Sequence, residues 1–157
     1  MSYRLGCELS SRIVAIAPVA GNMAASDGSA QEVGCLPARP VSLLAIHGTL
    51  DPNVPYAGGY SPVGHLTVAS FNDVIGVWRE IDGCAASSSV SVSGPTTTTI
   101  WPCQDGSTVE TKVIAGGEHD WPGSTVKPLS GLHAVFDASV VIADFFMAHA
   151  RTGREQH

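Results

Sequence analysis

Short apolar runs without strict alternation recur along the chain and predict the strands of a sheet. The first covers residues 13–19 and the second covers residues 41–46, and neither shows the period of two that a half-exposed strand requires. A strand covered on both faces loses that alternation, so the runs predict a mainly parallel sheet. Residues 97–101 and 109–114 flank a turn at 104–106, which predicts an added antiparallel pairing.

Helical spacing of apolar residues predicts three helices around this sheet. Residues 67–81 carry apolar side chains at helical spacing and stop at Gly83, and residues 2–11 place Leu5 and Leu9 on one face. In residues 131–148 the predicted apolar face consists of Leu132, Phe136, Val140, Ala143 and Met147. The Ser- and Thr-rich residues 87–99 predict a β-rich excursion, with a linker as the alternative.

Length and composition indicate one folded α/β domain that spans residues 1–157. The hydrophobic fraction is 44%, charged residues make up 14%, and the formal net charge is -6. Only eight Lys and Arg are present and they are scattered, which argues against a nucleic-acid partner. No apolar run approaches the roughly 20 residues that cross a bilayer, so we expect no membrane segment.

Four cysteines form an even set without a C-x-x-C pair, which argues against a zinc ribbon or a thioredoxin-like motif. Two disulfides are the better interpretation and would imply export from the cell. The first seven residues lack the apolar core of a signal peptide. We therefore expect a secreted protein whose chain was trimmed or whose natural start lies elsewhere.

Two loops carry the candidate chemistry. His47-Gly48-Thr49-Leu50-Asp51-Pro52 follows the second predicted strand, and His119 lies in a Gly-rich loop after the last one. Open α/β sheets bind ligands at strand ends of this kind. In α/β-hydrolases the catalytic residues follow the chain order Ser, Asp, His, and an acid followed by a histidine matches the last two of them. In that chemistry the histidine is the base and the acid fixes its tautomer.

At these motifs the chain resembles the secreted polyhydroxybutyrate-depolymerase and feruloyl-esterase-like α/β-hydrolases, which include polyester hydrolases. The resemblance rests on residues 1–5, 15–21, 47–56 and 116–123. It implies a partial α/β-hydrolase fold that acts on aromatic esters or polyesters without a metal or other cofactor. It also implies Asp51 as triad acid, His119 as triad base and Trp121 as an aromatic beside the cleft. The implied disulfides join Cys7 to Cys35 and Cys84 to Cys103.

The chain departs from this family at the nucleophile. In the family, Met-Ser-Tyr-Arg-Leu follows directly on the elbow G-x-S-x-G-G-M, and here that sequence occupies residues 1–5. The expected serine and the oxyanion-hole loop are therefore absent, and loss of one oxyanion donor alone costs about 10²- to 10³-fold in rate. Ser2 would lie inside a helix, and Ser10, Ser11 and Ser87–Ser89 also lack the strand-turn-helix context of a nucleophile.

Each candidate also has a simpler interpretation. Asp51 precedes Pro52 and could be a turn residue, His119 could be a loop histidine, and Trp121 could be a packing residue. His47 lies four residues before Asp51, but no third ligand has a convincing spacing, so a structural role is favoured over metal binding. His65, His133, His149 and His157 have no partner spacing and stay unassigned.

The resulting hypothesis is a carboxylic ester hydrolase built on Asp51 and His119. The alternative is a catalytically inert fragment that binds esters or associates with itself, and direct activation of water by the pair is a third, weaker possibility. In the parent fold a further strand pairs with the strand from Ile13 to Val19. We therefore expect its edge to be uncovered and a homo-oligomer to form there.

Overall fold

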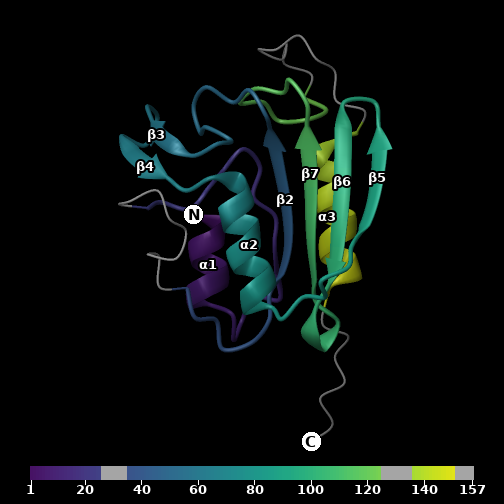
Figure 1. Ribbon diagram of the computed structural model, residues 1–157. Coiled ribbons are helices and arrows are strands. Elements are labelled where there is room, and N and C mark those ends of the chain that lie inside the picture. Colours follow the sequence, from purple (N-terminus) through teal and green to yellow (C-terminus); the bar gives the residue numbers. More distant parts are fainter. Residues whose placement is uncertain (26–34, 125–135, 151–157) are drawn as a thin grey trace, which may run out of the picture.

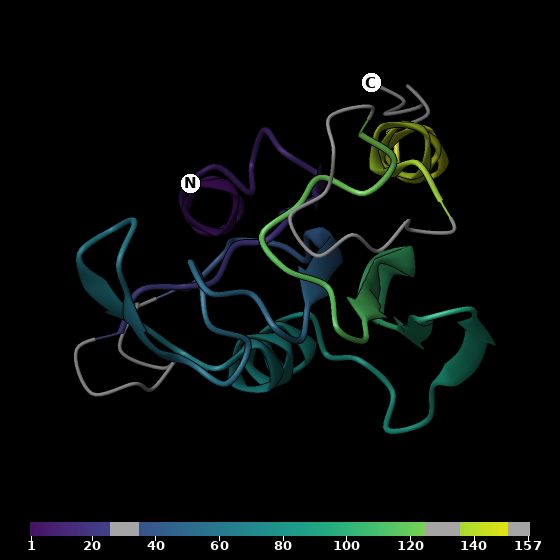
Figure 2. The same cartoon turned by 90° about the horizontal axis from the view of Figure 1, so that it is seen from above.

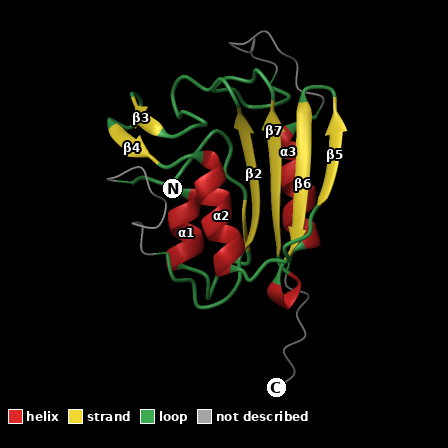
Figure 3. Ribbon diagram, in the orientation of Figure 1, coloured by secondary structure: helices red, strands yellow, loops and turns green. Residues whose placement is uncertain are grey.

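The computed structural model describes residues 1–25, 35–124 and 136–150, which form three layers with one sheet in the middle (Figure 1). The sheet has the strand order β1-β2-β7-β6-β5. Its strands are β1 (Ala15–Ile16), β2 (Ser42–Gly48), β5 (Ser89–Ser93), β6 (Thr96–Pro102) and β7 (Thr108–Ile114). Helices α1 (Ser2–Glu8) and α2 (Phe71–Ile81) cover one face, and α3 (Ala138–Ala148) covers the other (Figure 3).

The sheet is mixed, which corrects the expectation of a mainly parallel one. β1 and β7 run parallel to β2, but β6 runs antiparallel to β7 and β5 antiparallel to β6. The short connections at Gly94 and at Gln104–Gly106 explain this, because a tight turn can join only antiparallel neighbours. The predicted pairing of residues 97–101 with 109–114 is confirmed, and the linker alternative for residues 87–99 is wrong.

β2 is the centre of the core. All seven of its residues are buried, as the missing alternation predicted for a strand covered on both faces. Leu43 and Ala45 face the cluster under α1 and α2, and Leu44 and Ile46 face the cluster under α3. The strand therefore fixes the position of the loop that follows it.

The apolar faces predicted for α1 and α3 differ from the buried ones, although Phe136 does pack on the cluster under α3. In α1, Tyr3 and Gly6 are buried, because Gly6 packs against the side chains of Trp78 and Ile16 where a Cβ would meet Trp78 at 2.8 Å. Leu5 and Leu9 are left 37% and 38% exposed. The helix ends at Glu8 and not at residue 11.

In α3 the buried residues are Ala138 and Phe145, whereas Val140 and Met147 are exposed. The carboxylate of Asp137 accepts hydrogen bonds from the amides of Ser139 and Val140 and so caps the helix, which begins later than residue 131. Leu132 lies outside the described residues. The face was predicted wrongly because α3 is almost wholly apolar, so the spacing of its apolar residues does not distinguish one face of the helix from another.

A small hairpin, β3 (Gly59–Ser61) with β4 (Leu66–Val68), has no counterpart among the predictions. Its second strand includes Thr67 and Val68, which were predicted to begin the second helix. α2 instead begins after Ser70, whose hydroxyl accepts a hydrogen bond from the amide of Asp73. The helix ends at Ile81, as predicted, and Gly83 follows it with a φ of +58°.

Two disulfides, Cys7–Cys35 and Cys84–Cys103, are present in the pairing that the resemblance implied. The first ties α1 to the segment before β2, and the second ties the end of α2 to the turn between β6 and β7. None of the described helices is long and apolar enough to span a membrane.

Candidate active site

The two candidate loops meet because β2 and β7 are adjacent and parallel. His47 lies beside Val113 and Gly48 beside Ile114 in the register, so both strands end at the same edge of the sheet. The loops that follow lie together at the upper end of the sheet in Figure 1. This is the edge at which α/β sheets bind ligands.

Two glycines let the loops approach more closely than side chains would allow. A Cβ on Gly48 would lie 2.3 Å from the carbonyl oxygen of Gly117, and a Cβ on Gly117 would lie 3.1 Å from the Cα of Gly48. The amide of Leu50 donates to the Gly117 carbonyl at 2.8 Å, and the amide of Gly116 donates to the Thr49 hydroxyl at 2.9 Å. Backbone contacts therefore set the distance between the loops.

Asp51 is a buried and fully engaged carboxylate. Its side chain has no exposed surface, and its Oδ1 accepts hydrogen bonds of 2.8 Å from the amides of both Asn53 and Val54. Its Oδ2 accepts from His119. Burial of a carboxylate is costly unless its oxygens are paired, and here both are. The turn interpretation of Asp51 does not conflict with the catalytic one, because the turn bonds use Oδ1 and leave Oδ2 for the histidine.

His119 lies 2.9 Å from Asp51, measured from Nδ1 to Oδ2. Its side chain is 33% exposed, so it lies between the buried carboxylate and the surface. An ionised carboxylate only accepts, so the hydrogen-bond network assigns the proton to Nδ1. In that tautomer Nε2 carries the lone pair, and the ring can accept a proton there.

His47 is a core residue directly below this pair. It is 1% exposed and makes edge contacts with Phe71 at 5.3 Å and Tyr56 at 5.8 Å between ring centroids. Burial lowers the pKa of His47, which Asp51 and the Gly48 carbonyl partly oppose. Among the described residues no group of three His, Cys, Asp or Glu side chains is arranged to hold a metal ion. The structural interpretation of His47 fits these contacts.

Two large apolar side chains lie on the candidate loops. Trp121, two residues after His119, is 48% exposed, and its indole nitrogen donates to the hydroxyl of Ser139 at 3.1 Å. Leu50, which precedes Asp51, is 67% exposed. Leu50 could not be selected from the sequence, because a single leucine in a loop forms no periodic pattern. Gly48 and Gly117 were also missed as positioning residues, although they lie within residues 47–56 and 116–123, which carry the resemblance.

The serines considered from the sequence lie elsewhere. Ser2 is inside α1, and Ser10 is buried with its hydroxyl bonded to the amide of Ala38. His119 Nδ1 pairs with Asp51, and the Ser10 hydroxyl pairs with Ala38 instead. The geometry thus brings together an acid and a base but assigns them no nucleophile.

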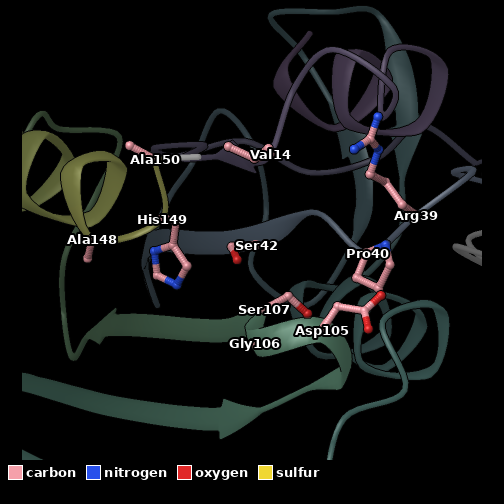
Figure 4. Close-up of a pocket in the computed structure, with 10 residues that line it drawn as sticks. All are labelled: Val14, Arg39, Pro40, Ser42, Asp105, Gly106, Ser107, Ala148, His149 and Ala150. Atoms are coloured by element: carbon pink, nitrogen blue, oxygen red, sulfur yellow. The ribbon is translucent and has the colours of Figure 1, made fainter. Parts of the chain in front are cut away.

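A separate hollow of about 370 Å³ lies at the opposite end of the sheet (Figure 4). Ser42 and Ser107, at the start of β2 and just before β7, line it together with Arg39, Asp105 and His149. The His149 Nε2 pairs with the Thr108 hydroxyl at 3.0 Å and Nδ1 pairs with the Phe145 carbonyl at 2.8 Å. Both ring nitrogens are therefore used within the fold.

No known family profile matches the chain. The chain is similar to feruloyl esterase B of Piromyces equi, with 32% identity over 124 residues, which cover 76% of this chain and 22% of that protein. It therefore spans about a fifth of the length of this curated relative. Over three quarters of its own length, the chain is related in sequence to an esterase.

Proposed function

We propose that the protein hydrolyses carboxylic esters and that Asp51 and His119 are its acid–base pair. The observation that carries the proposal is the 2.9 Å contact between a fully buried carboxylate and a partly exposed histidine at the carboxyl end of two adjacent parallel strands. The similarity to an esterase supports the same reaction class. The order of acid and base along the chain supports an α/β-hydrolase arrangement.

In the proposed mechanism, His119 Nε2 takes the proton of the attacking hydroxyl as oxygen bonds to the ester carbonyl carbon. The tetrahedral intermediate then collapses, the bond to the alkoxy group breaks, and His119 returns the proton to the leaving alcohol. Asp51 keeps the proton on Nδ1 and stabilises the imidazolium that forms. Its two amide hydrogen bonds hold the carboxylate in place throughout.

The attacking hydroxyl of the proposed mechanism must come from a serine or from water. The 157 residues contain no G-x-S-x-G motif. We propose a serine hydroxyl supplied by a further segment, as the resemblance implies, with water held by His119 as the weaker alternative. A fluorophosphonate probe separates the two, because it labels a serine nucleophile and leaves a water-dependent site active.

The proposed substrates are aromatic esters or polyesters, with no metal or organic cofactor. Trp121 and Leu50 support this class, since both expose apolar surface on the loops that carry the pair. Apolar substrates gain affinity from such surface, and the flat indole suits an aromatic ring. Export from the cell is proposed with it, because two disulfides suit an oxidising compartment.

The test is hydrolysis of a short-chain nitrophenyl ester by the wild-type protein that includes the segment with the proposed serine, compared with its His119→Ala variant. We expect the variant to lose the rate above buffer. His65→Ala is the matched control, because His65 is an exposed histidine on the β3–β4 turn and should leave the rate unchanged. Equal rates in all three proteins would contradict the proposal and favour the alternative, an inert domain that only binds esters.

A further inference from the structure

The β3–β4 hairpin turns one buried polar side chain toward the loop that carries Asp51. Strand β3 exposes Gly59 and Tyr60 but buries Ser61, which is 3% exposed. The Ser61 hydroxyl donates to the carbonyl oxygen of Asn53 at 2.6 Å. Figure 2, which looks onto the upper end of the sheet in Figure 1, shows the hairpin beside the chain that follows β2. A buried hydroxyl is costly unless it is hydrogen-bonded, so this contact holds the side chain in one direction.

The contact acts on a peptide group that also holds the proposed catalytic acid. The carbonyl of Asn53 and the amide N–H of Val54 belong to the same peptide group, which is planar and, when trans, points the two in opposite directions. The carbonyl accepts from Ser61, and the N–H donates to Asp51 Oδ1 at 2.8 Å. A hydroxyl that holds the carbonyl oxygen therefore also holds the N–H that faces the carboxylate.

The series of hydrogen bonds continues from this carboxylate to the base. Asp51 Oδ2 lies 2.9 Å from His119 Nδ1. The Ser61 hydroxyl, the peptide group, the carboxylate and the imidazole thus follow one another. Hydrogen bonds in such a series polarise one another, because a carbonyl that accepts a bond makes the N–H of its own peptide group a stronger donor. The Asp51 side chain has no exposed surface, and a hydrogen bond away from water is stronger than one in water.

A second contact holds the same loop farther from the acid. The amide of Phe71 donates to the carbonyl of Tyr56 at 2.8 Å and ties the loop to the start of α2. That carbonyl belongs to a later peptide group than the two whose N–H groups donate to Asp51. Loss of the α2 contact should loosen the loop as a whole, whereas loss of the Ser61 hydroxyl should act first on the acid.

We infer that Ser61 is a positioning residue for the Asp51–His119 pair, which it orients through the peptide group between Asn53 and Val54. The inference rests on the proposed function, since positioning affects the reaction only if this pair supplies its acid and base. Ser61 contacts the loop and not the substrate in this role, so its loss should lower kcat and leave KM nearly unchanged. A displacement of about 1 Å can cost about 10²-fold in rate, and we expect about tenfold for one lost hydrogen bond.

Amide hydrogen exchange followed by NMR tests the link without any substrate. The proteins are wild type, Ser61→Ala and Ser107→Ala. Ser107 is the matched control, because it is 8% exposed and its hydroxyl donates to the Gln104 carbonyl at 2.7 Å at the opposite end of the sheet. In Ser61→Ala we expect the Val54 amide to exchange about tenfold faster while the amides of β2 keep their rates. Ser107→Ala should leave the Val54 rate unchanged.

The kinetic readout uses the same substitutions in the protein that includes the segment with the proposed serine. Ser61→Ala should lower kcat for a nitrophenyl ester about tenfold at nearly constant KM, and Ser107→Ala should match wild type. An unchanged Val54 exchange rate in Ser61→Ala, or a rise shared equally by the amides of β2, would overturn the inference. A wild-type protein without esterase activity would contradict the proposed function, whereas the exchange rates would still decide whether Ser61 orients the pair.

Discussion

Two buried aspartates at opposite ends of the same sheet have different environments. At the carboxyl end, Asp51 accepts three hydrogen bonds, two from backbone amides and one from His119. At the other end, the Asp82 side chain accepts one bond, from the amide of Val41, and its Oδ2 has no partner among the described residues. Burial raises the pKa of Asp82 to about 7.

The two aspartates differ in what their carboxylates contact. Asp51 is held in one orientation by donors on its own loop, and its free oxygen is directed at a partly exposed base. Asp82 faces Val41 next to the start of β2 and lies just after α2, with no exposed surface. Asp51 contacts the partly exposed His119, whereas the Asp82 carboxylate has only the Val41 amide as a partner among the described residues, so we expect Asp82 to affect stability.

The largest effect should follow from disturbing the carboxyl end at Gly48. A Cβ there would overlap the Gly117 backbone, so Gly48→Ala must push the two loops apart, and we expect a loss of about 2–4 kcal/mol in the free energy of unfolding. Urea denaturation measures this loss. The downfield Nδ1 proton of His119 in NMR spectra should also weaken, because its distance from Asp51 changes.

Gly76→Ala is the matched control for this variant. Gly76 lies in α2 with no atom within 4 Å of an added Cβ, so the same change should stabilise the protein by about 0.5–1 kcal/mol. If Gly48→Ala were as harmless as Gly76→Ala, the backbone contact would not set the distance between the loops.

A smaller effect should appear at the other end through pH. Because the pKa of Asp82 is raised when folded, the folded state holds more protons than the unfolded one between about pH 4 and 7. Stability from this group should therefore be present below that window and decrease as pH rises through it. Asp82→Asn cannot ionise and should remove most of this slope.

The measurement is urea unfolding of both proteins at pH 4.5 and pH 8, where each pH lies near one end of the window. A control at an exposed carboxylate, Asp73→Asn, removes a charge without a buried group and should keep the wild-type slope. The prediction fails if Asp82→Asn shows the same loss of stability between the two pH values as the wild-type protein.

The central strand β2 and the β6–β7 pairing could be predicted from the sequence, and so could the positions of Asp51 and His119 after strand ends. β2 is apolar without alternation, and the motifs around Asp51 and His119 fix their places at strand ends. The distance between those two residues could not be predicted, since it depends on the contact of Gly48 with Gly117 across 69 positions of the chain.

The errors have physical causes in helix packing. The spacing of Leu5 and Leu9 predicted that they form the apolar face of α1. Gly6 instead allows the helix to approach Trp78 closely, so α1 buries the side that carries Tyr3 and Gly6. In α3 the apolar residues surround the helix and give no direction. The β3–β4 hairpin was missed because its strands have only three residues each, too few for a period to show.

The most direct test of the central claim is a double-mutant cycle on ester hydrolysis with Asp51→Asn, His119→Ala and the double variant. If the two residues act as one unit, each single change lowers kcat/KM, by about 10²- to 10⁴-fold if a complete triad is present. The double variant should then be no slower than His119→Ala. An unchanged rate in Asp51→Asn, or losses that multiply in the double variant, would contradict an acid–base pair.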